Sequence, residues 1–126
     1  MDYNKLKKIL DALYLAYRHE FSSKDPVWKV RSFNDEPDAE LAGFITAVYT
    51  YGSVDLINKF VASFMERLNH KPYEFIINFS KHKDKKYLKG LNYRFNTAGD
   101  AIKLVTALNK VLTEYGSLNN LFCKGY

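Results

Sequence analysis

The chain has 126 residues, and its 19 lysines and arginines against 14 aspartates and glutamates give a formal net charge of +5. A hydrophobic fraction of 47% with only 3 prolines and 6 glycines excludes a disordered or fibrous protein and predicts one folded domain. The single cysteine, Cys123, excludes an internal disulfide and a multi-cysteine metal centre, and it favours a reducing, cytoplasmic location. The longest weakly polar run, residues 41–51, is too short to span a bilayer, so we expect no membrane partner.

The first predicted element is an amphipathic helix over residues 2–19. Its apolar side chains recur at steps of three and four, which places them on one face: Tyr3, Leu6, Ile9, Leu10, Leu13 and Tyr17. The period is lost over residues 20–38, where turn formers such as Asp25 and Pro26 predict a loop. This loop contains several large apolar residues, so we expect it to lie against the rest of the chain.

A second helix is expected to begin after Asn34 or Asp35, either of which can act as its N-cap. The acids of its first turns are expected to meet the positive end of the helix dipole: Glu36, Asp38 and Glu40. Gly43 lies inside this helix at a cost of about 1 kcal/mol relative to alanine, which predicts a close helix contact there. The predicted core face consists of Leu41, Phe44, Ile45 and Val48.

Three further helices follow in chain order. Gly52 is expected to stop the second helix and Ser53 to cap a third, whose predicted core face is Leu56, Ile57, Phe60, Val61, Phe64 and Leu68. Pro72 opens a short fourth helix, and the pair Thr97 and Asp100 predicts a capping box for a fifth. That helix is expected to stop at Gly116, before one last helical turn. The sequence therefore predicts an all-α fold of five main helices plus short helical turns.

Residue types that carry catalysis or bind metal are not grouped along the chain. The three histidines, His19, His70 and His82, lie in separate segments, and none has a second ligand at metal-binding spacing. Cys123 has no histidine beside it, and the sequence has no glycine-rich phosphate loop. We therefore assign no catalytic residue, no metal ligand and no cofactor.

The most distinctive segment is the basic stretch of residues 81–95, which carries six basic residues against one acid, Asp84. Its net charge of five equals that of the whole chain, so the other residues balance. One interpretation is a connector kept soluble by its lysines. The other is a phosphate-binding surface, in which Tyr87 and Tyr93 stack on an exposed base or anchor the loop: its cations would be Lys85, Lys86, Lys89 and Arg94.

Four motifs in succession carry a resemblance to a known family: "AELAGFITAVYTYGSVDLINKF", "KPYEFIINFS", "LKGLNYRFNTAGDAIKLVTAL" and "EYGSLNNLF". In this order they resemble the N-terminal half of an uncharacterised bacterial family that is carried as a domain of unknown function. The full-length members of that family are similar to the helix-hairpin-helix (HhH-GPD) DNA glycosylases of base-excision repair. The resemblance implies a partial glycosylase-like helical bundle, with residues 1–126 as one domain from the N-terminal portion of a longer fold.

The resemblance also bears on the site. Tyr51 stands where the glycosylases insert a glutamine toward DNA, and it joins the candidate nucleic-acid-binding residues Lys85, Lys86, Lys89, Tyr93 and Arg94. The hairpin and the catalytic aspartate of the superfamily would follow Tyr126, so this chain alone is expected to be noncatalytic. We thus expect weak, nonspecific DNA binding through residues 81–94. The alternative is an independent helical module for protein interaction or structure, and unpartnered apolar helix faces imply a homodimer.

Overall fold

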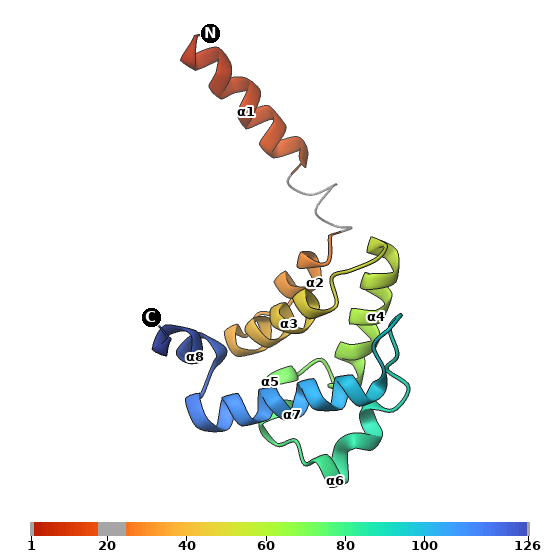
Figure 1. The fold of residues 1–126 in the computed structure, drawn as a ribbon. Coiled ribbons are helices and arrows are strands. Elements are labelled where there is room, and N and C mark those ends of the chain that lie inside the picture. The colour runs from red at the N-terminus through yellow and green to blue at the C-terminus, as the bar shows by residue number, and fades with distance from the viewer. Residues whose placement is uncertain (1, 18–24, 126) are drawn as a thin grey trace.

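The computed structural model describes residues 2–17 and 25–125, and within them every regular element is helical, which confirms the all-α prediction. The elements follow one another along the chain from the N-terminal α1 to the C-terminal α8 (Figure 1). They are α1 (Tyr3–Tyr17), α2 (Val27–Arg31), α3 (Glu36–Val48), α4 (Val54–Arg67), α5 (Pro72–Ile77), α6 (Lys81–Asp84), the 3₁₀ helix η2 (Lys85–Leu88), α7 (Ala98–Tyr115) and α8 (Leu118–Lys124).

The hydrophobic core lies among α3, α4 and α7, and the short α5 contacts both α3 and α7. Each long helix contributes one buried stripe, such as Leu41 and Ile45 of α3, Phe64 of α4 and Val105 of α7. Burial of a large apolar side chain stabilises the fold by about 1.5–3 kcal/mol. The burial of these stripes therefore holds the helices together.

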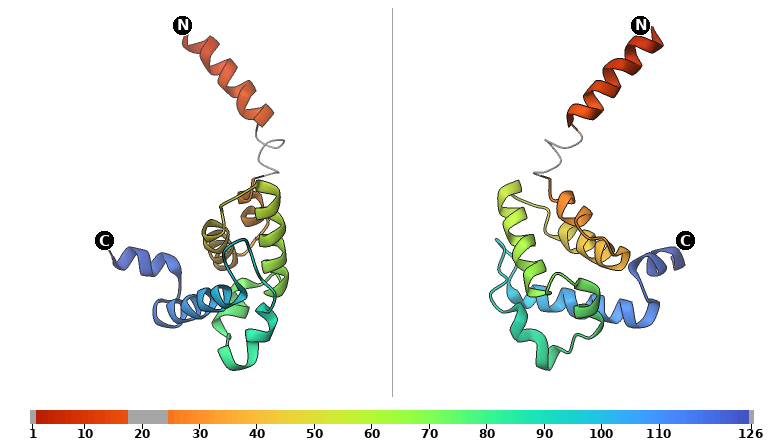
Figure 2. Two further views of the ribbon diagram at one scale, coloured as in Figure 1. Left: turned by 45° about the vertical axis from the view of Figure 1, so that its right-hand side comes forward. Right: turned by 180° about the vertical axis from the view of Figure 1, so that it is seen from behind.

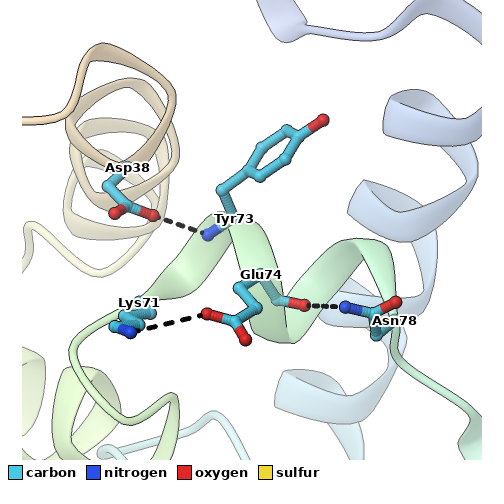
Figure 3. Close-up of polar contacts among 5 residues, drawn as sticks. All are labelled: Asp38, Lys71, Tyr73, Glu74 and Asn78. Atoms are coloured by element: carbon cyan, nitrogen blue, oxygen red, sulfur yellow. Dashed lines mark hydrogen bonds and ion pairs between the residues drawn. The ribbon is translucent and has the colours of Figure 1, made fainter.

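Two acids at the start of α3 bind the beginnings of other helices. The Asp38 carboxylate accepts a hydrogen bond of 2.8 Å from the backbone N–H of Tyr73 in α5 (Figure 3). The Glu40 carboxylate accepts from the N–H groups of Leu118 and Asn119 in α8, at 3.2 and 2.7 Å. Free N–H groups at a helix start need such acceptors. The expectation that these acids serve only the dipole of their own helix was therefore incomplete.

The polar contacts around α5 extend along its length. Lys71 forms an ion pair of 3.7 Å with Glu74, and the Asn78 side chain donates to the backbone carbonyl of Glu74 (Figure 3). The Asn109 side chain of α7 donates to the carbonyls of Ile76 and Ile77 at the end of α5. Both ends of this six-residue helix are thus held by side chains, which compensates for its shortness.

Helix α1 stands apart from the other helices in all three views (Figures 1 and 2). It has no buried residue, although its apolar side chains share one face as the sequence predicts. Leu6, Ile9, Leu10 and Leu13 are between 39% and 54% exposed. The predicted extension of this helix to residue 19 falls outside the described residues.

Several local predictions are confirmed. The Ser53 hydroxyl accepts from the N–H of Leu56 at the start of α4, and Thr97 and Asp100 form the capping box of α7. Gly116 ends α7 in the left-handed conformation, with φ of 82°. Gly52 is also left-handed, with φ of 96°, but α3 already ends at Val48, so the prediction that Gly52 stops this helix was wrong. The contact predicted at Gly43 is with α2, because a Cβ at Gly43 would lie 3.5 Å from a methyl carbon of Val30.

Three further predictions about residues 20–56 were wrong. Residues 27–31 are helical rather than a loop, because the Asp25 side chain and backbone carbonyl accept from the N–H groups of Val27 and Trp28. Val48 and Leu56 are 42% and 50% exposed rather than core residues. In α3 the buried row runs from Leu41 through Ile45 to Tyr49 at steps of four, which leaves Val48 beside it. In α4 the buried stripe begins one residue later than predicted.

Burial of Tyr49 makes stability depend on pH. Burial, with smaller contributions from Asp100 and Tyr51, raises the pKa of Tyr49 from 10.0 to about 12. The unfolded chain loses this proton near pH 10 and the folded chain near pH 12, so stability is full below pH 10 and falls across this interval. At about 1.4 kcal/mol per pH unit, the loss approaches about 2–3 kcal/mol.

We expect Tyr49→Phe to flatten this part of the stability profile. Urea unfolding of both proteins at pH 9, 10 and 11, followed by circular dichroism, measures the difference in its pH dependence. Parallel profiles for the variant and the parent would contradict the assignment to Tyr49.

Candidate nucleic-acid interface

The basic stretch forms α6 and η2, and its only acid is used by the backbone. The Asp84 carboxylate accepts a 2.7 Å hydrogen bond from the N–H of Ser80 at the start of α6. Its lysines are all exposed, and within residues 2–17 and 25–125 no carboxylate lies within ion-pair distance of them. We call these residues the basic turn: Lys81, Lys83, Lys85, Lys86 and Lys89. Their charges are therefore available to an external anion.

Arg67, the last residue of α4, fixes the shape of the basic turn. Its Nη1 donates to the carbonyl oxygens of Tyr87, at 3.1 Å, and of Lys89, at 2.7 Å. These bonds hold η2 and the residue after it against the end of α4. The sequence reasoning missed Arg67, because nothing near it in the sequence indicates that its partners lie about twenty residues further on.

Two candidate residues, Tyr51 and Tyr93, bind each other's backbone. The Tyr51 hydroxyl donates to the carbonyl of Tyr93 at 2.9 Å, and the Tyr93 hydroxyl donates to the carbonyl of Tyr51. Tyr93 is 5% exposed, and its ring lies 4.9 Å from that of Phe60 and 5.0 Å from that of Tyr51. Of the two roles expected for Tyr93, stacking on a base or anchoring the loop, this geometry supports anchoring.

Arg94 and Phe95 form the two-residue tip of a tight turn that follows the basic turn. Tyr93 and Asn96 close it with two backbone hydrogen bonds of 2.8 and 2.9 Å. Arg94 has a left-handed φ of 52°, and its guanidinium carbon lies 5.9 Å from the centre of the Tyr51 ring. Its Nη1 would lie 2.5 Å from a Cβ on Gly52, so a larger residue there would displace the guanidinium, and the φ of 96° at Gly52 itself favours glycine.

The six predicted site residues thus fall into two groups. Lys85, Lys86 and Lys89 lie near the C-terminal end of α4, where Arg67 binds the carbonyl oxygens of Tyr87 and Lys89. Tyr51, Tyr93 and Arg94 lie at its N-terminal end, beside Gly52. The helix α4, with 14 residues at about 1.5 Å each, is about 20 Å long, and the five residue steps from Lys89 to Arg94 can span at most about 18 Å of this length.

A groove of about 1080 Å³ adjoins the basic turn, and two residues that lie between its lysines in the sequence, Asp84 and Tyr87, line this groove. Its wall contains the ring pair Phe75 and Tyr87, whose centroids are 6.2 Å apart, and the cations Arg67 and Lys71. The described residues contain no group of three histidines, cysteines or acids that could hold a metal ion. The groove wall also contains the acids Glu66, Glu74 and Asp84, so its charges are mixed, and the positive charge suited to an anionic partner lies on the basic turn.

Residues 25–126 match the model of the family described as "Protein of unknown function (DUF2400)". The chain belongs to this family. The match begins after α1, so this helix lies outside the matched residues. Searches found no match among curated proteins and none among solved structures. Of the helices in the described parts of the chain, none is both long and apolar enough to cross a membrane.

The paired tyrosines generate a stability prediction. We expect Tyr93→Phe to lower the free energy of unfolding by about 1–2 kcal/mol, because it removes one hydrogen bond and leaves the Tyr51 carbonyl without that donor. Tyr87→Phe is the matched control, since this ring is 48% exposed, and we expect a change within about 0.5 kcal/mol. Urea unfolding measures both. Equal changes in the free energy of unfolding for the two substitutions would show that the hydrogen bond from Tyr93 to the Tyr51 carbonyl adds nothing to stability.

Proposed function

We propose that this member of the family is a noncatalytic helical module that binds DNA weakly and without sequence preference through residues 81–94. The observation that carries the proposal is the basic turn itself. Its five lysines have no carboxylate partner among the described residues, and the only acid in the segment is occupied by the backbone.

The chemistry of the cations determines the kind of binding. Lysine ammonium groups are point charges that attract phosphates without reading bases, so they supply affinity rather than sequence preference. Arg94 adds a planar cation near the other end of α4, at most about 18 Å along the chain from Lys89. A duplex carries one phosphate per strand for about every 3.4 Å of its axis, so this distance corresponds to about five base pairs. One short stretch of DNA can therefore contact both groups.

The salt dependence of binding tests this proposal. If about three to four phosphates are neutralised, log K should fall against log [salt] with a slope near −3. The variant Lys85→Gln/Lys86→Gln/Lys89→Gln should flatten the slope to about −1 or less, as measured by fluorescence anisotropy with a labelled duplex between 25 and 200 mM NaCl.

A matched control removes the same charge elsewhere. Lys5, Lys103 and Lys110 are exposed and lie on α1 and α7, so their joint replacement by glutamine should leave the slope within about 0.5 of the parent. If both triple variants flattened the salt slope equally, the net charge of the protein alone would account for DNA binding. Absence of binding at 25 mM NaCl would favour the alternative, a structural or protein-interaction module.

The glycosylase-like part of the proposal rests on the order of the sequence motifs. In this interpretation the chain corresponds to the leading helices of a glycosylase-like fold. Tyr51, at the place of the inserted glutamine, has its hydroxyl bound to the Tyr93 carbonyl, so glutamine-like insertion would require that bond to break. We expect no base excision from lesion-containing duplexes by this chain alone. Excision would overturn the noncatalytic assignment.

A second candidate function is self-association through α1, which the exposure of its apolar face favours. Tyr3, Leu6, Leu10 and Leu13 follow one another at steps of three, four and three, the spacing of a coiled-coil seam. Such a seam fits an identical helix, and a two-fold dimer is the commonest closed assembly. The partner we propose for this face is therefore a second copy of the chain.

Light scattering tests the self-association. We expect a mass about twice the 14.7 kDa of one chain, and a monomer for Leu10→Glu, which places a charge in the seam. Leu15→Glu is the control, because Leu15 lies on the opposite side of α1 and is 66% exposed. A monomeric parent at high concentration, or dissociation by Leu15→Glu alone, would contradict the proposal.

A further inference from the structure

Phe95 is the most exposed large apolar side chain among the described residues, at 87% exposure. Phe122, by comparison, is 54% exposed at the C-terminal α8. Leaving a phenylalanine in water forfeits about 1.5–3 kcal/mol that burial would provide. The position of Phe95 therefore needs a physical explanation.

The exposure of Phe95 is held in place by the surrounding structure. The tip is closed by the hydrogen bonds between Tyr93 and Asn96, and Tyr93 is anchored through its hydroxyl to the Tyr51 carbonyl. On the far side, the Asn92 side chain accepts from the N–H of Ala98 at the start of α7. Hydrogen bonds thus hold the turn both before and after its tip, and the exposed ring of Phe95 lies on a fixed backbone.

The tip also carries backbone strain. Arg94 has a φ of 52°, a conformation that costs a non-glycine residue of the order of 1 kcal/mol. Strain of this kind persists where the surrounding contacts determine the conformation, and it is concentrated at functional sites. Here it sets a cation and an exposed aromatic ring side by side at the end of α4.

We propose that Phe95 stacks on an unpaired base and thereby makes this surface prefer single-stranded DNA over a duplex, an inference that rests on the proposed DNA binding. An exposed ring beside cations is the usual means of binding single strands, because every base offers a flat face to the ring. Duplex bases are already stacked on one another, so a duplex would gain only the phosphate contacts.

The cations decide between DNA and an apolar protein partner. A protein pocket for Phe95 would need acids around it to meet Arg94 and the basic turn, whereas a nucleic acid supplies regularly spaced negative charge. A single strand that places a base on Phe95 can contact Arg94 with an adjacent phosphate. Its next phosphates can then run along α4 toward Lys89 and Lys86, near the other end of this helix.

The experiment compares labelled 15-nucleotide oligothymidylate with a 15-base-pair duplex, using the full chain at 25 mM NaCl and fluorescence anisotropy. We expect Phe95→Ala to weaken single-strand binding by about 5- to 100-fold, the range for loss of one base–aromatic stack. Duplex affinity should change less than about twofold, and the salt slope should stay the same because no charge is removed. Phe95→Trp should retain the single-strand preference.

Phe122→Ala is the matched control, an exposed phenylalanine on α8, and it should leave both affinities unchanged. Three outcomes overturn the stacking inference: equal parental affinity for both probes, equal weakening of both by Phe95→Ala, or no weakening by Phe95→Ala. If any of these occurs while the triple lysine variant still flattens the salt slope, DNA binding stands and only the role of Phe95 fails. If the parent binds neither probe, both proposals fail together.

Discussion

The ties between α4 and residues 85–96 are the constraint on which the candidate interface depends. At one end of α4, Arg67 binds the carbonyls of Tyr87 and Lys89. At the other end, Tyr51 and Tyr93 bind each other's carbonyls beside Gly52. A segment with only one turn of 3₁₀ helix thereby acquires a fixed path along a regular helix. The cations and the exposed ring are positioned by this path rather than by any secondary structure of their own.

Local sequence signals were sufficient for most of the helices. Helix starts at Ser53 and Thr97, and the stop at Gly116, depend on hydrogen bonds and φ values within a few residues, so short motifs predict them. The helix over residues 27–31 was missed because it has five residues, too few for a hydrophobic period to appear.

The candidate site was less predictable, because its geometry depends on long-range contacts. The charge of the basic turn is visible in the sequence. The hydrogen bonds from Arg67, in contrast, reach residues that are 20 and 22 positions further along the chain. Likewise, Tyr93 in a basic stretch could stack or anchor, and only its burial against Phe60 distinguishes the two roles. Phe95 stood in the same stretch, but exposure cannot be derived from a residue type.

The Glu40 contacts also have a consequence for the order of folding. The residues that they join are separated by 78 and 79 positions in the sequence. The entropy lost in closing so long a loop must be offset by two hydrogen bonds and by the burial of Leu118. Contacts between α3 and α5 close a much shorter loop, of about 35 residues. Helix α8 should therefore dock after the central helices have formed and be among the first to detach, as a unit of low local stability.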